Sequence, residues 1–316
     1  MAVSFFLDRY AMIDKKEIMC FIRMVLMKRL FSFLIILSFL LCLFGCAPQE
    51  SVQIAATTLP VYEFTNLLCD GTNLRVGRLV TENVSCLHDY TLQVWQMRMI
   101  ESADTIVISG GGLEDFLEDV LMEQPVIDAS EHIELICPET EDHHDHQGHH
   151  HETDPHYWLS PVYAKIMAEN ICVGLSANYP EHAAVFQENL TALTKKLDAL
   201  QSYGEETLTN LSSRELITFH DGFSYFAESF DLTIHKAIEE ESGQEASAAE
   251  LKELIELVRE HQVSTIFTET NGSVSAADVI AAETDCCQYQ LDMAMAGESY
   301  FTSMYHNIDT IKEALE

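Results

Sequence analysis

Basic residues are scarce in this chain. Lys and Arg number 17 against 51 Asp and Glu, which gives a formal net charge of −34 at pH 7. A surface with so much negative charge repels phosphate backbones, so we expect no nucleic-acid partner. The same surface could modestly concentrate divalent cations, but solubility is an equally good explanation of its charge.

Two common metal-site motifs are also missing. None of the nine cysteines forms a CxxC pair, and no disulfide pairing can be read from their spacing. Nothing resembles HExxH or another hydrolytic motif. A zinc hydrolase needs a general base beside an open water position. Glu269 is the only motif-borne carboxylate available, and the sequence does not place it at a metal. We therefore expect no enzyme and keep a zinc-dependent hydrolase as the weaker alternative.

The long apolar run of the chain lies near the N-terminus. Residues 27–46 begin with Met-Lys-Arg, continue as a short apolar run and end in Gly45-Cys46. This order is typical of a secretory signal and not of a membrane span. The tetrapeptide Leu-Phe-Gly-Cys resembles a bacterial lipobox, which predicts lipidation of Cys46. We expect a signal peptide over residues 1–45, with translation starting at Met27, and a lipid-anchored protein on the cell membrane or in a periplasm. A plain secreted protein or an uncleaved anchor is the alternative.

The remaining chain, about 270 residues, is long enough for two lobes. Strand-like runs such as LRVGRLV and ADTIVISGG alternate with helix-period segments, including one over residues 113–121, and the second half repeats the pattern. This order predicts an α/β fold in which each lobe holds a mostly parallel sheet flanked by helices. We place the first lobe at 46–179 and the second at 212–316.

A different kind of segment lies between the two halves. Residues 180–211 keep a helical apolar spacing for their whole length. At ~1.5 Å per residue, one helix there would be roughly 45 Å long and could run along both lobes. We predict a single linking helix, with two helices broken near Gly204 as the alternative.

A polar, His-rich tract over residues 141–153 cannot bury a core, so we predict a mobile loop there. Such a loop could hold metal loosely and pass it to a better site, although nonspecific binding by a solvated loop is the plainer interpretation. Its candidate auxiliary metal ligands are His143, His144, His146, His149, His150 and His151.

Three further histidines each sit in a motif of their own. His88 lies in SCLHDYT, His156 in DPHYWLSP and His220 in TFHDGFSYF. His156 follows a proline-fixed turn, and His220 follows a strand-like run, at the strand end where open α/β sheets place ligands. Imidazole is a ligand that suits zinc. We therefore predict that these three side chains converge on one Zn²⁺ ion.

A tetrahedral site needs a fourth ligand. Asp292 ends a strand-like stretch and is our candidate, with water, Cys86 or Glu269 as competitors. Three nitrogens with one oxygen favour zinc over manganese, which prefers oxygen-rich sites.

Several of these motifs resemble one family, the zinc/manganese-binding solute-binding proteins of bacterial ABC transporters. The resemblance rests on 154–161, 218–230, IFTET at 266–270 and SGGGLEDFLE at 109–118, and it extends from about Val52 to Leu315. His88, His156 and His220 match the three histidine ligands of that family. Asp292 matches an aspartate that ligates in only some members. The chain departs from the family at Cys86-Leu87, where Asp-Pro is usual.

The resemblance implies two α/β lobes joined by one long helix, with the metal in the cleft between them. It implies Zn²⁺ as a transported ligand, delivered to a membrane permease driven by a cytoplasmic ATPase. His220 favours zinc because manganese-type members usually carry glutamate there, and a manganese-type member is the alternative. A surface adhesin or a zinc-buffering lipoprotein without a permease would have a similar sequence. We expect a monomer.

Overall fold

The structure is a computed structural model that describes residues 19, 21–33 and 52–316. Within the last range it leaves out residues 83, 85–86, 88–89, 118, 122–123, 138–152, 240–246 and 271–273. The chain forms two compact units, Met1–Glu50 and Ser51–Glu316. In the first unit, residues 21–33 are helical. In the described part of the chain, no helix is both long enough and apolar enough to cross a membrane.

The first sheet has four parallel strands in the order β2-β1-β3-β4. The strands are β1 (Ile54–Ala56), β2 (Val76–Arg78), β3 (Thr105–Ile108) and β4 (Val126–Asp128). The helices that follow β1 and β2 are α3 (Leu59–Leu68) and α4 (Val94–Ser102). Because β1 and β3 are neighbours whose following connections leave in opposite directions, their carboxyl ends form a topological switch point.

The second sheet repeats this arrangement with the order β6-β5-β7-β8, again parallel throughout. Its strands are β5 (Glu215–His220), β6 (Thr233–Glu239), β7 (Thr265–Glu269) and β8 (Cys287–Leu291). Its helices are α7 (Ser224–Ser229), α8 (Ala248–Glu260), α9 (Ser275–Thr284) and α10 (Tyr300–Leu315). The two parallel sheets flanked by helices confirm the predicted fold class. The predicted lobe boundaries stay predictions.

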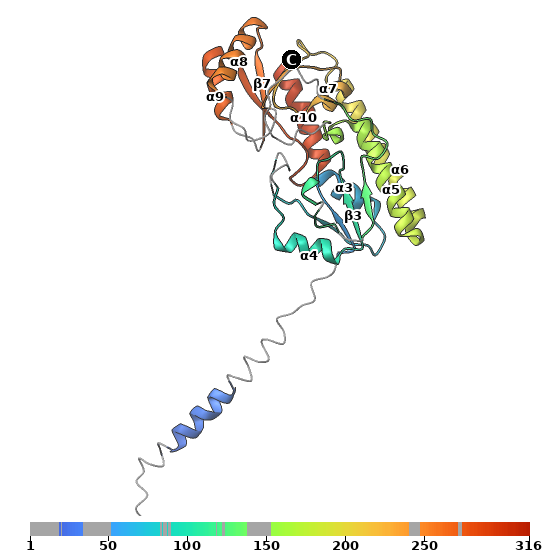
Figure 1. The fold of residues 1–316 in the computed structure, drawn as a ribbon, viewed down its shortest axis with the longest axis vertical. Coiled ribbons are helices and arrows are strands. Elements are labelled where there is room, and N and C mark those ends of the chain that lie inside the picture. Colours follow the sequence, from blue (N-terminus) through green and yellow to red (C-terminus); the bar gives the residue numbers. More distant parts are fainter. Residues whose placement is uncertain are drawn as a thin grey trace, which may run out of the picture. The chain divides into compact units, whose positions relative to one another are not determined.

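Two long helices, α5 (Pro161–Asn178) and α6 (Ala183–Thr207), pack against each other beside the first sheet (Figure 1), and α6 contacts both α3 and α10. A short 3₁₀ turn, Pro180–His182, joins them. Near its start, α6 contacts the first sheet's helix α3, because Asn189 Nδ2 donates to Leu68 O at 2.9 Å. Near its end, the Tyr203 hydroxyl donates to Asp309 of α10 at 2.6 Å.

The α6 helix continues through Gly204, where a break was the alternative. A Cβ on Gly204 would lie 2.2 Å from Cε1 of Phe230. Glycine therefore lets the Phe230 ring pack directly on the helix backbone. The linking helix is continuous here because close packing, and not a chain break, accounts for the glycine.

The cores lie on both faces of each sheet. The largest apolar cluster joins α3, α5, α6 and α10 to one face of both sheets. A second cluster packs α8 and α9 on the other face of the second sheet, and a third packs α4 on the other face of the first. Because both faces of each sheet are covered, the central strands β1, β3, β5 and β7 are largely buried apolar runs, whereas the edge strands β2, β4, β6 and β8 are partly exposed.

The helix predicted over residues 113–121 is wrong. The described residues of this stretch form only one 3₁₀ turn, Asp115–Leu117. Gly110, Gly111 and Gly112 all have positive φ, and the Glu114 carboxylate turns back to accept from Gly110 N at 2.9 Å. These local interactions hold the backbone in a turn and compete with the helix.

Candidate metal centre

His156 lies directly before the 3₁₀ turn Tyr157–Leu159 and is 5% exposed. Asp154 Oδ1 lies 2.8 Å from His156 Nδ1 and also accepts from the His156 backbone N–H at 2.9 Å. A carboxylate at Nδ1 keeps the ring proton on that nitrogen. The Nε2 lone pair is then free to bind a cation, which is how ligating histidines are commonly oriented.

Aromatic side chains hold this ring in place. Trp158 packs edge-on to His156 with ring centroids 5.3 Å apart, and its Nε1 donates to Met293 O at 2.8 Å. The Tyr225 hydroxyl donates to Asp154 O at 2.9 Å, and the Tyr300 hydroxyl donates to Trp158 O at 2.8 Å. Each of these bonds ties the motif to a different element, so the His156 ring has little freedom to move.

His220 is the last residue of β5 and is also 5% exposed. Glu269, the last residue of β7, is buried, and its Oε1 lies 3.7 Å from His220 Nδ1. Because β5 and β7 are neighbours with connections leaving in opposite directions, both side chains lie at the switch point of the second sheet. The strand-end position predicted for His220 is confirmed.

The two histidines face each other through the same nitrogen. His156 Nε2 and His220 Nε2 are 3.4 Å apart, and the rings are nearly perpendicular at 86°. Two nitrogens bound to one tetrahedral zinc, each at about 2.0–2.1 Å, would also be about 3.4 Å apart. The same distance allows a weak hydrogen bond when one ring carries its proton on Nε2. The pair is therefore arranged to share either a proton or a metal ion.

Gly222 makes room for this pair. A Cβ on Gly222 would lie 2.6 Å from Met293 Cε, 2.7 Å from His220 Cδ2 and 3.0 Å from His156 Nδ1. Any larger residue would push against both imidazoles. Close backbone approach thus explains the glycine that follows the His-Asp pair in the motif.

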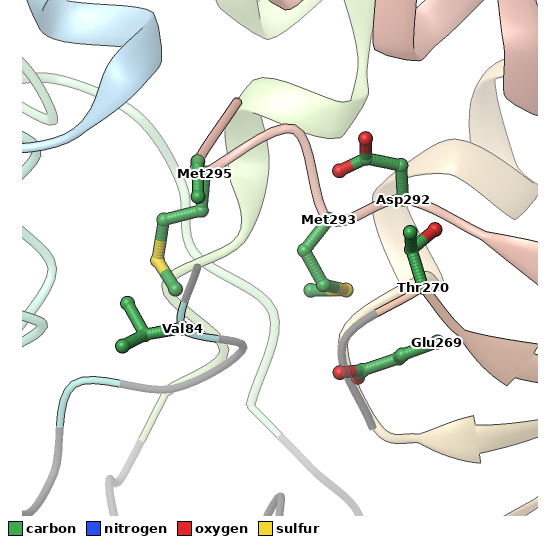
Figure 2. Close-up of a pocket in the computed structure, with 7 residues that line it drawn as sticks. Val84, Glu269, Thr270, Asp292, Met293 and Met295 are labelled. Atoms are coloured by element: carbon green, nitrogen blue, oxygen red, sulfur yellow. The ribbon is translucent and has the colours of Figure 1, made fainter. Parts of the chain in front are cut away.

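Asp292 follows β8 directly, so its predicted place at a strand end is confirmed. Its carboxylate accepts from Ala294 N and from Ser303 Oγ, each at 2.8 Å. Asp292 and Glu269 both line a small pocket, and Figure 2 shows their carboxylates pointing to different sides. Its role as a metal ligand stays a prediction.

Several predicted site residues lie outside the described part of the chain. They are His88, Cys86, the lipidation site Cys46, and the loop histidines His143, His144, His146, His149, His150 and His151. Val84, four residues before His88, lines the same pocket as Glu269 (Figure 2). Among the described residues, no three His, Cys, Asp or Glu side chains gather in ligating geometry. His88, the third histidine predicted as a ligand, is not among these described residues.

The sequence analysis missed the carboxylates that lie behind the two rings. Asp154 was interpreted only as part of a turn, and Glu269 only as a competing ligand or base. The Asp-Pro-His order carried a signal, because an Asp two residues before a ligating His can reach its Nδ1. For Glu269 the signal appears only once β5 and β7 are known to be neighbours.

The described cysteines are all free thiols: Cys69, Cys137, Cys172, Cys286 and Cys287. Burial raises the pKa of Cys69 to about 12, so that thiol is unreactive at neutral pH. Among these residues, no sulfur contributes to the histidine pair.

The chain matches known proteins over nearly all of the second unit. The family model "ZnuA: Zinc-uptake complex component A periplasmic" matches residues 54–314. The zinc-binding lipoprotein AdcA of Streptococcus pneumoniae is 32% identical over 298 residues, which cover 87% of this chain and 59% of AdcA. This chain therefore spans less than two thirds of AdcA.

Solved structures of the same family also match this chain. A ZnuA crystal structure is 28% identical, with a TM-score of 0.73, and the match covers 84% of this chain and all of that one. Zn(II)-bound AdcA from S. pneumoniae is 29% identical, with a TM-score of 0.71, and covers 84% of this chain and 58% of that one.

A third structure is the laminin-binding protein Lmb of Streptococcus agalactiae, described as bifunctional with adhesin and metal-transporting activity. It is 25% identical, with a TM-score of 0.71, and covers 83% of this chain and 99% of Lmb. With its family model matched from the first strand to the last helix, this chain belongs to the ZnuA family of periplasmic zinc-uptake components.

Proposed function

We propose that this protein captures Zn²⁺ outside the cytoplasm and delivers it to the permease of an ABC transporter. The observation that carries the proposal is the 3.4 Å separation of His156 Nε2 and His220 Nε2, with a carboxylate behind each ring. The relative AdcA is a zinc-binding lipoprotein, and its crystal structure is Zn(II)-bound.

In this proposal His88, His156 and His220 each give one nitrogen to the ion, and Asp292 or a water completes the tetrahedron. Asp154 and Glu269 do not bind the metal. Asp154 holds the Nδ1 proton of His156, which fixes the tautomer of that ring and raises the basicity of its Nε2. Glu269 Oε1, 3.7 Å from His220 Nδ1, places a negative charge behind the second ring at more than hydrogen-bond distance. Asp154 and Glu269 also place two buried carboxylates beside the histidine pair. Buried negative charge is unfavourable when it is unpaired, so a bound divalent cation would stabilise it.

Selectivity follows from the donor set. Three imidazoles favour zinc over manganese, since manganese prefers oxygen ligands and stands lower in the order of affinities for a given site. A manganese-type protein is the alternative, and replacement of zinc by excess Mn²⁺ would identify it.

Delivery needs a location and a partner. Lipidation of Cys46 would hold the protein on the outer face of a membrane, beside a permease with its cytoplasmic ATPase. The histidine-rich loop, 141–153, would collect Zn²⁺ weakly and pass it to the tight site. Deletion of that loop should remove weak equivalents of zinc and leave the tight one.

Adhesion is a second candidate function, favoured by the likeness to Lmb, a bifunctional protein with adhesin activity. Loss of growth in zinc-poor medium after deletion of the gene supports transport, whereas unchanged growth and zinc uptake would favour adhesion or buffering. A zinc hydrolase remains the weaker alternative. Metal-dependent turnover of an ester or amide would be needed to support it.

The direct test is substitution of one ligand. His156→Ala should weaken zinc binding by about 10²–10³-fold, since a structural zinc site contributes ~10–16 kcal/mol shared among four ligands. The matched control is His306→Ala, because His306 is an exposed histidine on α10. Zinc retained after dialysis against a chelator would be measured for both variants. Equal retention by His156→Ala and by the unsubstituted protein would refute the proposed site.

A further inference from the structure

The hydroxyl of Tyr225 joins the two histidine motifs. Tyr225 lies in α7, on the stretch of chain that follows His220, and its side chain is fully buried. The hydroxyl donates to Asp154 O at 2.9 Å and accepts from Ile136 N at 2.7 Å. Asp154 N in turn donates to Ile136 O at 2.7 Å. One hydroxyl of the His220 motif therefore holds two backbone groups that precede His156 in the chain.

Both of these bonds need the hydroxyl in its protonated form. A tyrosine hydroxyl has one proton to donate and lone pairs that can accept. Burial raises the pKa of Tyr225 above its ordinary value, so the proton stays on the oxygen at neutral pH. Phenylalanine at this position would keep the ring but would leave Ile136 N and Asp154 O without this partner.

A second contact, one turn further along α7, fixes the same helix face. Ser229 Oγ donates to Ser160 Oγ at 2.7 Å, and Ser160 is the N-cap of α5. Tyr225 and Ser229 are four residues apart, so they lie on one side of the helix. The Tyr225 ring also packs edge-on against Tyr163 of α5, with centroids 5.4 Å apart. Rotation of α7 that would withdraw the hydroxyl would break all of these contacts.

The bond from Tyr225 leads directly to the metal-binding ring. Asp154, whose backbone oxygen accepts it, holds His156 Nδ1 through its own carboxylate at 2.8 Å. On the other side, Gly222 lies between His220 and Tyr225 in the chain, and a Cβ there would meet both imidazoles. His220, Tyr225, Asp154 and His156 thus form a closed circuit of covalent and hydrogen-bonded links. The Nε2–Nε2 distance of 3.4 Å is one side of that circuit.

We propose that Tyr225 is a positioning residue of the zinc site. Its hydroxyl holds Asp154 against α7, and this keeps His156 Nε2 at the distance from His220 Nε2 that one ion can bridge. The proposal rests on the proposed function, because it needs zinc to bind between these two nitrogens. Tyr225 does not bind the ion, since its hydroxyl is already bonded to Asp154 and Ile136.

The test is a double-mutant cycle on zinc affinity, measured by competition with a chelating dye. Tyr225→Phe should weaken zinc binding by about 10–100-fold, as loss of an outer partner of a ligating histidine commonly does. If Tyr225 acts through Asp154, the double variant Tyr225→Phe/Asp154→Asn should lose much less than the product of the two single losses. Losses that multiply would overturn the proposal.

Tyr203→Phe is the matched control. Its hydroxyl donates to Asp309 at 2.6 Å, so this variant also loses one tyrosine hydrogen bond to an acidic residue. Urea unfolding of the metal-free proteins measures what each hydroxyl contributes to stability. Zinc affinity should fall only in Tyr225→Phe. Equal zinc affinity in Tyr225→Phe and Tyr203→Phe would overturn the proposal.

Bound Co²⁺ gives a second measurement, because the intensity of its visible bands depends on how nearly tetrahedral its ligands are. These bands should change in Tyr225→Phe and stay unchanged in Tyr203→Phe. A Co²⁺ spectrum of Tyr225→Phe identical to that of the unsubstituted protein would contradict a positioning role.

Two further results separate this proposal from its neighbours. In a protein lacking residues 141–151, Tyr225→Phe should still weaken zinc binding by the same factor. Disappearance of the effect there would assign the hydroxyl to the histidine-rich loop and overturn the role through Asp154. Failure of the unsubstituted protein to retain zinc would refute the proposed function and this proposal together. Retained zinc with an unaffected Tyr225→Phe would refute this proposal alone.

Discussion

At the residue scale, His156 and His220 differ in how tightly neighbouring carboxylates hold them. Asp154 makes two bonds to His156, to its ring and to its backbone. Glu269 Oε1 lies 3.7 Å from His220 Nδ1, which is too far for a hydrogen bond. His156 is thus the more rigid of the pair, and His220, carried by the second sheet, has more room to adjust.

Asp154→Asn tests the rigid half of this pair. Asparagine can no longer hold the Nδ1 proton as a charged acceptor, so zinc affinity should fall by about 10–100-fold. Affinity would be measured by competition with a chelating dye. Asp198→Asn is the control, because Asp198 is an exposed carboxylate paired with Lys165. An unchanged affinity in Asp154→Asn would show that this carboxylate does not orient the ring.

Glu114 should make stability depend on pH. Its burial raises the pKa of the carboxyl to about 7, although bonds from Thr57 and the backbone of Ser109 and Gly110 oppose the shift. A raised folded-state pKa stabilises the protein fully below the unfolded value of 4.5, and that contribution is lost as pH rises to about 7. Urea unfolding of the unsubstituted protein should therefore show a loss of stability between these pH values.

Glu114→Gln should lack this loss. It should also be less stable by ~1–3 kcal/mol at low pH, because its amide would face the Gly110 N–H donor. The difference in the free energy of unfolding between Glu114→Gln and the unsubstituted protein should become smaller as pH rises. Exposed Glu101→Gln is the control. An identical pH slope in Glu114→Gln and the unsubstituted protein would contradict the assignment.

The residue types of the site could be predicted from the sequence, but their partners could not. The motifs around His156 and His220 were enough to predict both residues as metal ligands. Their Nε2–Nε2 distance depends on how the 3₁₀ turn after His156 meets the end of β5, which no local pattern specifies. The need for glycine at position 222 likewise depends on His156, His220 and Met293, which only the fold brings close to it.

At the element scale, the alternation of strands and helices was readable because parallel strands buried on both faces are short apolar runs. The helix α5 was missed, since its apolar residues nearly surround it and give little helical periodicity. The prediction of a helix over residues 113–121 failed for the opposite reason. Their spacing suits a helix, but the Glu114 carboxylate and three glycines hold the backbone in a turn.

Gly204→Ala tests how α6 packs on the second sheet. Alanine normally favours a helix over glycine by about 1 kcal/mol, but here its Cβ would lie 2.2 Å from the Phe230 ring. We expect a net destabilisation of ~1–3 kcal/mol, as for other overpacked sites, measured by urea unfolding.

The double variant Gly204→Ala/Phe230→Ala provides the check. If the clash with the ring causes the loss, the two changes will not be additive, and the Gly204 substitution will cost less when the ring is absent. Additive losses, or a stabilised Gly204→Ala, would mean that the helix has room at this position.

At the scale of the whole molecule, the two sheets contribute differently to one site. The second sheet supplies His220 and Glu269 from the carboxyl ends of its strands and would also supply the predicted ligand Asp292. His156 comes from the segment that leads into α5, and the predicted ligand His88 comes from the loop between β2 and α4. A site assembled from several separate segments can open or close as they shift, which suits a protein that must both bind a metal and release it.

The negative charge of the molecule belongs to this scale as well. A net charge of −34 draws cations to the surface without choosing among them. In the proposed site, selection comes from the buried imidazoles, and their binding of metal would compete with protons. Zinc affinity should fall at acidic pH, and a pH-independent affinity would contradict ligation by histidine.

The most direct test of the central claim is a competitive titration of the protein from Cys46 onward with Zn²⁺ and Mn²⁺, followed by metal analysis after dialysis. We expect one zinc ion to be retained per chain and not to be displaced by excess manganese. Preference for manganese, or no retained metal, would contradict the assignment of His88, His156 and His220 as the ligands of a zinc site.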